Sequence, residues 1–236
     1  ALDAHHPVIA THRAQGKRVL YVDEQHIVAQ EGASQVRIAL AEVPLTQNGA
    51  IGFQVENTLA SIGAAWAVGL SWPAICQGLA TFVNDAQAVP GRFNLFSFKG
   101  ATVIADYGHN PDAIKALVQA VKNLPAKQRS VVISGAGDRR DEDIREQTRV
   151  IGEAFERVVL YEDACQRGRA DGEVLNLLKQ GLQNATLTKD VAEIRGEFIA
   201  IDHALDQLTP GDLCLVLIDQ VDEALAHIGK RVAEQR

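Results

Sequence analysis

Short apolar runs, each followed by a polar loop and then an amphipathic segment, recur along the second half of the chain. The runs occupy residues 101–105, 130–134, 157–161 and 213–218. Runs of this length between polar loops are typical of strands that are buried on both faces. Strands that alternate with helices build parallel sheets with right-handed crossovers, so the pattern predicts an α/β fold with a mostly parallel sheet.

The first part of the chain has a different pattern, in which short strands precede helices rich in small residues. The expected strands are 18–22, 25–29 and 36–40, and the expected helices are 52–69 and 72–82. The stretch 84–92 contains Pro90 and Gly91, which interrupt both helical and strand periodicity. The sequence therefore predicts two domains, residues 1–89 and residues 90–236.

The loop after the first apolar run of the second half is dense in side chains that can bind ligands. It runs from Asp106 to Asp112 and places a carboxylate and the imidazole of His109 where a strand ends. Asn110 is a good N-cap, and Pro111 suits the first helical position because its missing N–H costs nothing there. In open α/β sheets such loops lie at the carboxyl edge, where ligands bind. A simple capped turn is the alternative.

One acid follows each of the four runs, and a parallel topology places these acids along one edge of the sheet. They are Asp106, Asp138, Asp163 and Asp219. The same loops contain Arg139, Arg140, Arg167 and Arg169. Each acid alone could be a helix cap or a solvated loop residue, but acids and arginines gathered at one edge favour a site for a charged ligand.

The composition is that of an ordinary globular protein and narrows the classes of function. The 236 residues are 47% hydrophobic and carry a net charge of −7, without a basic run or a stripe of basic and aromatic residues. Nucleic-acid binding therefore has little support. No segment approaches the length of a membrane span and no secretory signal is visible, so a cytoplasmic protein without membrane contact is expected.

Neither the cysteines nor the histidines indicate a metal site. Cys76, Cys165 and Cys214 are an odd number without Cys-x-x-Cys spacing, which is typical of reduced thiols. Cys165, in a charged loop, is the one cysteine that we consider as a ligand contact. The histidines of residues 1–89 show no spacing of metal ligands.

Several motifs together resemble the Mur ligases and folylpolyglutamate synthases, which are ATP-dependent amide-forming enzymes. They are Asn57 with its small-residue helix, Pro90-Gly91-Arg92, the loop 106–113 and the Gly-x-Gly-Asp-Arg loop 135–139. Within that superfamily the chain looks most like the carboxyl-terminal part of the cyanophycin synthetases, through residues 91–94, 106–113, 134–144 and 163–173. The resemblance implies that residues 1–89 end the central ATPase domain and that residues 90–236 form the Rossmann-like carboxyl-terminal domain.

The resemblance also implies roles for individual residues. The residues implied to bind the nucleotide are Asn57, Arg92, Asp106, His109 and Asn110. Those implied to face the amino acid or the polymer are Asp138, Arg139, Arg140, Asp163, Cys165, Arg167 and Arg169. The candidate catalytic residues are His109, Asp138 and Arg139. Acids suit a guanidinium, whereas an arginine fork matches a carboxylate. The alternatives are that Asn57 caps its helix and that Arg92 is a surface hinge residue.

The implied reaction joins arginine to the side-chain carboxylate of a polyaspartate backbone. The carboxylate attacks the γ-phosphate of ATP, with Mg²⁺, to give an acyl phosphate that the amine of arginine displaces. Arginine and the polyaspartate chain are therefore the implied partners, and the full-length protein is expected to be a homo-oligomer.

The chain departs from this family in one respect. A P-loop needs Gly, four residues, Gly-Lys and then Ser or Thr. The Gly-Lys pairs at Gly16 and Gly229 lack both the upstream glycine and the hydroxyl residue. The family's magnesium ligands cannot be placed either. Because the chain also contains no methionine, we expect it to be a piece of a longer polypeptide that does not turn over ATP alone.

Two alternatives to this function stay open. One is a related Mur-type ligase for another amino acid, which a titration of arginine against glutamate, lysine and diaminopimelate would separate. The other is a non-catalytic module that binds a nucleotide or a polymer. The reading frame upstream of Ala1 would decide that case, since a contiguous Gly-Lys-Thr segment favours the enzyme.

Overall fold

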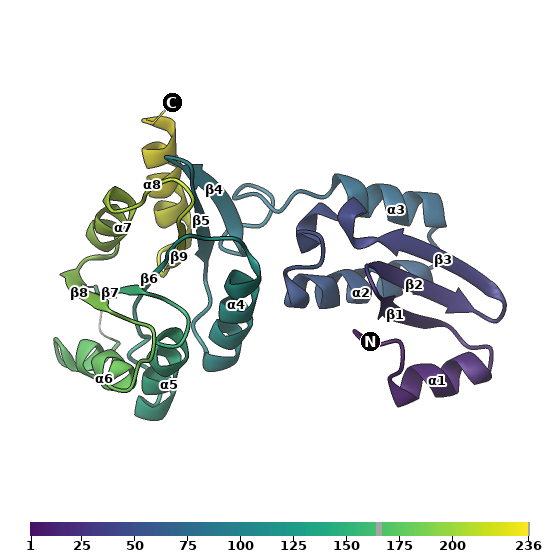
Figure 1. The fold of residues 1–236 in the computed structure, drawn as a ribbon, viewed down its shortest axis with the longest axis horizontal. Coiled ribbons are helices and arrows are strands. Elements are labelled where there is room, and N and C mark those ends of the chain that lie inside the picture. The colour runs from purple at the N-terminus through teal and green to yellow at the C-terminus, as the bar shows by residue number, and fades with distance from the viewer. Residues whose placement is uncertain (164–166, 236) are drawn as a thin grey trace. The chain divides into compact units, whose positions relative to one another are not determined.

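The computed structural model describes residues 1–163 and 167–235, which belong to two compact units (Figure 1). Unit 1 comprises Ala1–Val83 and unit 2 comprises Asn84–Arg236. Each unit has its own hydrophobic core, so each is described by itself.

The division between the units falls after Val83, whereas the sequence placed the boundary after Val89. Two side-chain amides tie the intervening residues to unit 2. Asn84 Nδ2 donates to the backbone oxygen of Arg92 at 2.6 Å, and Asn94 Nδ2 donates to that of Val89 at 2.9 Å. The periodicity of the sequence ends near this segment, but these hydrogen bonds decide to which unit the segment belongs.

Unit 1 is a small antiparallel sheet packed against helices. Its elements are α1 (Pro7–Ala14), β1 (Val19–Asp23), β2 (His26–Glu31), β3 (Ser34–Ala39), η1 (Leu40–Glu42), η2 (Pro44–Thr46), α2 (Gly52–Ala67) and α3 (Trp72–Thr81). The sheet has the order β1-β2-β3. Its core joins Ile27 of β2 to Ile62 of α2 and Ile75 of α3, all of them buried. The expected strands and helices are present, and α1 is an addition that the sequence did not predict.

Unit 2 is a six-stranded sheet with helices on both faces. Its strands are β4 (Asn94–Phe98), β5 (Ala101–Asp106), β6 (Arg129–Ile133), β7 (Arg157–Glu162), β8 (Asp190–Arg195) and β9 (Leu213–Leu217). Its helices are α4 (Pro111–Asn123), α5 (Asp141–Ile151), α6 (Glu173–Leu182), α7 (Glu197–Asp206) and α8 (Val221–Ala233). The strand order is β4-β5-β9-β6-β7-β8; β4 runs antiparallel to β5, and the other neighbours pair in parallel. The predicted mostly parallel α/β sheet is confirmed.

The strand order explains why the polar loops meet at one place. The chain crosses the sheet from β5 through β6 and β7 to β8, and then returns to β9, which lies between β5 and β6. Right-handed crossovers therefore put α4, α5 and α6 on one face and α7 on the other (Figure 1). The carboxyl ends of β5, β9, β6 and β7 lie next to one another around this reversal of direction. Such switch points are where open α/β sheets bind ligands.

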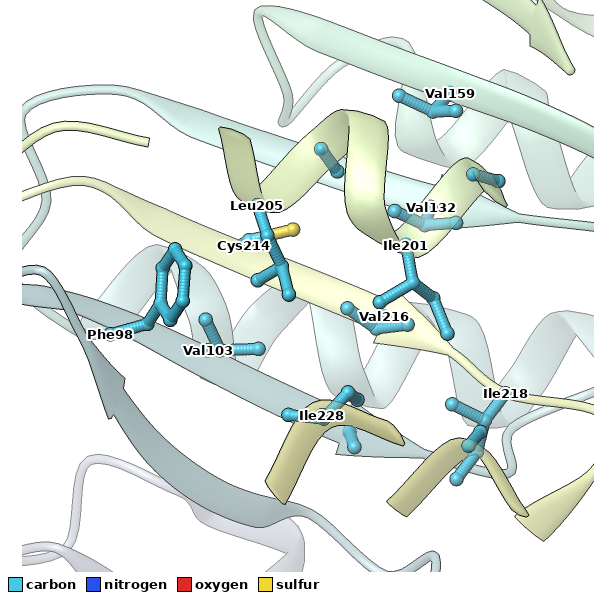
Figure 2. Close-up of a cluster of buried hydrophobic side chains, with 14 of the residues drawn as sticks. Phe98, Val103, Val132, Val159, Ile201, Leu205, Cys214, Val216, Ile218 and Ile228 are labelled. Atoms are coloured by element: carbon cyan, nitrogen blue, oxygen red, sulfur yellow. The ribbon is translucent and has the colours of Figure 1, made fainter. Parts of the chain in front are cut away.

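Apolar side chains hold α7 and α8 against one face of the sheet (Figure 2). Ile201 of α7 and Ile228 of α8 are fully buried in one cluster with Val132 and Val216 of the central strands. The alternate residue Val131 points to the opposite face and is also fully buried. Burying an aliphatic side chain of this kind contributes about 1.5–3 kcal/mol. The sheet is therefore a well-packed base for the loops at its edge.

The sequence pattern did not reveal β4, β8 or α7. β8 is an edge strand whose residues are alternately exposed and half-buried, and β4 is the opposite edge strand, with Leu95 exposed. Edge strands do not show the continuous apolar run of a strand that is covered on both faces. The helix α7 begins directly after β8 and Gly196. Because β8 was not predicted, no predicted strand indicated that a helix of the sheet would follow it.

Candidate functional site

The loops that follow β5, β6, β7 and β9 line one hollow at the carboxyl edge of the unit 2 sheet. Its lining residues are His109, Ser134, Gly135, Ala136, Gly137, Tyr161, Asp163, Arg167 and Asp219. The hollow is small, with a volume of about 10 Å³, which is about what one water molecule needs. Side chains from the carboxyl ends of four strands therefore meet around one small space.

Arg167 links the loops around the hollow. Its guanidinium lies 3.0 Å from a carboxylate oxygen of Asp219 and 3.5 Å from one of Asp138. The backbone φ of Arg167 is 49°, in the left-handed region that residues other than glycine rarely adopt. All three side chains are partly exposed to solvent, so these ion pairs add little to stability. They are better suited to exchange partners with a charged ligand.

His109 also lies beside Asp219. Its Nε2 is 3.5 Å from the Asp219 oxygen that Arg167 contacts, and its ring packs on Tyr107 with centroids 4.4 Å apart. Burial lowers the pKa of the imidazole, and the charge of Asp219 partly opposes this shift. The ring is therefore mainly neutral at pH 7, and a neutral imidazole can accept a proton.

Asp163 and Asp219 are held by two residues that the sequence did not single out. Gln220 Nε2 donates to Asp163 at 3.0 Å and to Glu197 at 3.3 Å. Glu197 also accepts the backbone amides of Asp219 and Gln220. No signal in the sequence could have identified Glu197, because its partners lie 22 and 23 residues further along the chain in another crossover unit. Tyr161 also lines the hollow and was missed, because its position belongs to an apolar run.

Asp106 lies on the same edge, but its carboxylate does not line the hollow. Its Oδ2 accepts the backbone amide of Phe93 at 2.8 Å. Burial raises the pKa of Asp106 to about 6, although the Phe93 amide and the charge of Arg92 oppose the shift. The carboxyl group fastens the turn at residues 91–94, where Phe93 has a φ of 54°. The sequence located the edge on which Asp106 lies but not the direction of its side chain.

The other arginines of these loops differ from Arg167. The side chain of Arg169 is 15% exposed and donates to the backbone oxygens of Gly137 and Arg139, both at 2.7 Å. It thereby holds the shape of the glycine loop that follows β6. Arg140 pairs with an acid of α5 and is 78% exposed, and Arg139 is exposed. None of these three lines the hollow, although the sequence grouped them with Arg167.

The remaining residues implied to bind a nucleotide also lie outside the hollow. Asn57 is an exposed residue of α2 in unit 1 and donates to Gln54 at 3.0 Å. Because α2 begins at Gly52, the alternative that Asn57 caps this helix is wrong. Arg92 is exposed in unit 2, and Asn110 caps α4, as predicted, by accepting a backbone amide at 2.8 Å. The candidate Cys165 lies outside the described residues.

Two glycines allow the loops to pack closely around the hollow. A Cβ atom on Gly135 would lie 2.9 Å from Val174 Cγ1, and one on Gly108 would lie 2.7 Å from Leu117 Cδ1. Real Cβ atoms essentially never come under 3.0 Å. A side chain at either position would therefore require Val174 or Leu117, or the loop itself, to shift.

The described ranges 1–163 and 167–235 contain no group of three His, Cys, Asp or Glu residues that could hold a metal ion. In the same part of the chain, no helix has both the length and the apolar character needed to cross a membrane.

Comparison with known proteins places this architecture in a family. The Mur ligase glutamate ligase domain matches residues 91–217. The cyanophycin synthetase of Synechocystis sp. is 34% identical over 98% of this chain. The UDP-N-acetylmuramoyl-L-alanyl-D-glutamate--2,6-diaminopimelate ligase of Alkaliphilus metalliredigens is 30% identical over 76% of the chain and 35% of its own length. E. coli FolC, solved in complex with DHPP and ADP, superimposes with a TM-score of 0.65 at 21% identity, over 99% of this chain and 52% of FolC.

The chain spans 26% of the length of the Synechocystis relative. The likeness to FolC, at 21% identity, shows the fold. The match to the cyanophycin synthetase covers 98% of this chain and therefore includes the loops that line the hollow.

Proposed function

We propose that this chain, which belongs to the Mur ligase family through a glutamate ligase domain at residues 91–217, is the amino-acid-binding part of an ATP-dependent amide ligase. The amino acid is arginine, and the acceptor is a side-chain carboxylate of a polyaspartate backbone. The observation that carries the proposal is the meeting of Arg167, Asp219 and His109 at the switch point of the sheet. The 34% identity to a cyanophycin synthetase supports this choice of substrates.

The charges of the hollow match the two ends of free arginine. The acids Asp163 and Asp219, which line the hollow, and Asp138, which pairs with Arg167 beside it, suit the guanidinium, which donates several hydrogen bonds in a fixed fork. Arg167 suits the α-carboxylate, because the two groups can pair bidentately. Since Arg167 already contacts Asp138 and Asp219, incoming arginine would exchange these internal ion pairs for equivalent ones. Such an exchange keeps the guanidinium and the α-carboxylate paired.

The amide forms when the neutral α-amine of arginine attacks the carbonyl carbon of the acyl phosphate, the carbon–oxygen bond to phosphate breaks, and inorganic phosphate leaves. The attacking amine loses one proton as the carbon–nitrogen bond forms, so a nearby base assists the step. His109 is suited to take this proton, because burial keeps its imidazole mainly neutral. Its Nε2 lies within 3.5 Å of Asp219, which would stabilise the protonated ring.

Activation of the acceptor by ATP and Mg²⁺ needs groups that these residues do not supply. The sequence contains no P-loop motif, and the described residues hold no cluster of metal ligands. Asp106, which the resemblance assigns to the nucleotide, has one oxygen engaged with the Phe93 amide. We therefore assign the chain to the amino-acid half of the reaction and expect no ATP turnover from it alone. Sustained arginine-dependent ATP hydrolysis by the 236 residues would contradict this assignment.

Calorimetric titration of the chain with arginine tests the proposed function. Citrulline is the matched control ligand, because it has nearly the same shape and no charge on its side chain. We expect arginine to bind at least about tenfold more tightly, a difference of about 1.4 kcal/mol. Addition of salt should weaken arginine binding more than citrulline binding. Equal affinities for the two ligands would contradict an acidic pocket for a guanidinium.

A related ligase for another amino acid is the second candidate. It is favoured by the 30% identity to a diaminopimelate ligase over 76% of the chain. Diaminopimelate carries both an ammonium and a carboxylate at its far end, so it would compete for Arg167 as well as for the acids. Titration with diaminopimelate, lysine and glutamate beside arginine separates the two candidates. Tighter binding of diaminopimelate than of arginine would favour the second.

A further inference from the structure

A buried carboxylate supports the hollow from below. Glu197 is the first residue of α7 and is 1% exposed. Its Oε1 accepts the backbone amide of Asp219 at 2.8 Å, and its Oε2 accepts that of Gln220 at 3.1 Å. The two oxygens thus hold two of the three residues that connect β9 to α8.

Both amides lie just before the first helical residue of α8, Val221. Gln220 is the N-cap, and its backbone amide is one of the donors at a helix start that have no partner within the helix. In a capping box, an acid three residues after the N-cap would accept this amide. Here the carboxylate of Glu197, from another helix, accepts it. One side chain of α7 therefore holds the β9–α8 connection, together with the hydrogen bond from the Ile218 amide to the Asp106 backbone oxygen.

Two links lead from Glu197 to the charged groups of the hollow. Through the backbone, it fixes Asp219, whose carboxylate is 3.0 Å from Arg167 and 3.5 Å from His109. Through a side chain, it accepts Gln220 Nε2 at 3.3 Å, and the same nitrogen donates to Asp163 at 3.0 Å. Glu197, which is buried and does not line the hollow, therefore helps to hold the positions of both acids that do line it.

We propose that Glu197 is a positioning residue that sets the preference of the hollow for a cationic amino acid by holding the carboxylates of Asp219 and Asp163. This inference rests on the proposed function. Glu197 does not touch the substrate; it fixes the distance between two acids, and a guanidinium needs both at the right spacing. Loss of the grip should weaken the binding of a cationic side chain more than that of a neutral side chain of the same shape.

The variant Glu197→Gln tests this directly. It preserves the size of the side chain but replaces one acceptor oxygen with an NH₂ group that would face a backbone N–H. Asp212→Asn is the matched control. Asp212 lies at the opposite end of β9, is 7% exposed, and accepts the backbone amide and the hydroxyl of Thr209 at 2.9 and 2.8 Å. Both changes remove the charge of a buried acid that holds a turn, but only one turn carries residues of the hollow.

The measured quantity is the ratio of the citrulline to the arginine dissociation constant on folded chain. We expect Glu197→Gln to lower this ratio about tenfold, or by about 1.4 kcal/mol, and Asp212→Asn to leave it unchanged. The conservative variant Glu197→Asp should restore part of the ratio. A merely structural role would lower the stability of both variants and leave both ratios as in the wild type, and this result would overturn the proposal.

A second variant covers the case in which Glu197→Gln does not fold. Gln220 is exposed, so Gln220→Ala should fold and should break only the link to Asp163. We expect a smaller loss of preference, of about threefold. An unchanged ratio in this variant would count against the proposal.

Amide hydrogen exchange separates failure of this inference from failure of the proposed function. If the wild-type chain does not prefer arginine to citrulline, the proposed function fails, and the exchange rates still test the grip of Glu197. The amides of Asp219 and Gln220 should exchange faster in Glu197→Gln than in the wild type, whereas the Thr209 amide should not. Unchanged rates at Asp219 and Gln220 would overturn the inference whatever the ligand.

Discussion

The two ends of the unit 2 sheet use charged side chains in different ways. At the amino end, Asp212 accepts the amide and hydroxyl of Thr209, and Arg129 donates to the backbone oxygens of Val121 and Leu124. At the carboxyl end, the charges of the hollow pair with one another across separate loops, as Arg167 does with Asp219. A charged side chain that is hydrogen-bonded to nearby backbone is held in place by the local structure. A charge paired with another loop can exchange that partner for a ligand.

The carboxyl end also contains charges of the first kind, and they lie just outside the hollow. Glu197 holds the backbone after β9, Arg169 holds the backbone after β6, and Asp106 holds the turn at residues 91–94. These groups support the loops, whereas Arg167 and Asp219 pair with each other and can exchange that partner for a substrate. The difference between binding and support therefore follows the partner of each charge rather than its residue type.

The largest effect on binding is expected from Asp219→Asn. Asp219 contacts both Arg167 and His109, so its charge is central to the hollow. We expect arginine binding to weaken about 100-fold, or by about 2.7 kcal/mol, which is in the range for a hydrogen bond between charged groups. Stability to urea should change by less than about 0.5 kcal/mol, because these ion pairs are partly exposed. A loss of binding below twofold in the calorimeter would remove Asp219 from the site.

A pH-dependent effect is expected from Asp106→Asn. The pKa of Asp106 in the folded chain is about 6, above its ordinary value of 3.8, so the folded chain keeps a proton between about pH 4 and pH 6 that the unfolded chain has released. Stability should therefore fall as pH rises through this window, by roughly 2 kcal/mol for this group. The variant lacks this titrating group. Its free energy of unfolding should therefore increase relative to that of the wild type as pH rises. Urea unfolding at pH 4, 5, 6 and 7 measures it, and parallel curves would contradict the buried carboxyl.

The paired variants Arg167→Ala and Arg169→Ala should separate binding from support. Loss of Arg167 should weaken arginine binding about tenfold with little change in stability, because its pairs are partly exposed. Loss of Arg169 removes two hydrogen bonds to backbone oxygens and should lower the free energy of unfolding by about 1–2 kcal/mol. Calorimetry and urea unfolding of both variants give the comparison. Equal losses in both measurements would mean that the two arginines have the same role.

The smallest effect is expected at the amino end, from Asp212→Asn. The free energy of unfolding should fall by about 1 kcal/mol, because the amide oxygen keeps some of the hydrogen bonding to Thr209. Arginine binding should not change. Weaker binding in this variant, measured on folded chain, would mean that the two ends of the sheet are not independent.

Much of this fold could be predicted from the sequence, because four central strands are buried on both faces and therefore appear as apolar runs. The edge strands β4 and β8 face solvent on one side and gave no such signal. For the site, only the edge of the sheet on which it lies could be predicted, and not which side chains line it. Parallel topology places Asp106, Asp163 and Asp219 on one edge, but the direction of each side chain depends on contacts made after folding, such as that of Asp106 with Phe93. For the same reason, the sequence does not distinguish Arg167, which lines the hollow, from Arg169, which holds the backbone of a neighbouring loop.

The most direct test of the central claim is a titration of the chain with arginine, followed by backbone NMR of the amides of unit 2. The claim is that side chains from separate crossover units form one binding site at the carboxyl edge. The amides of residues 135–137 and of Asp219 and Gln220 should shift with a common dissociation constant, whereas those of Thr209 and Asp212 at the amino end should not. Shifts confined to the amino end or to unit 1, or no shifts at all, would contradict the claim.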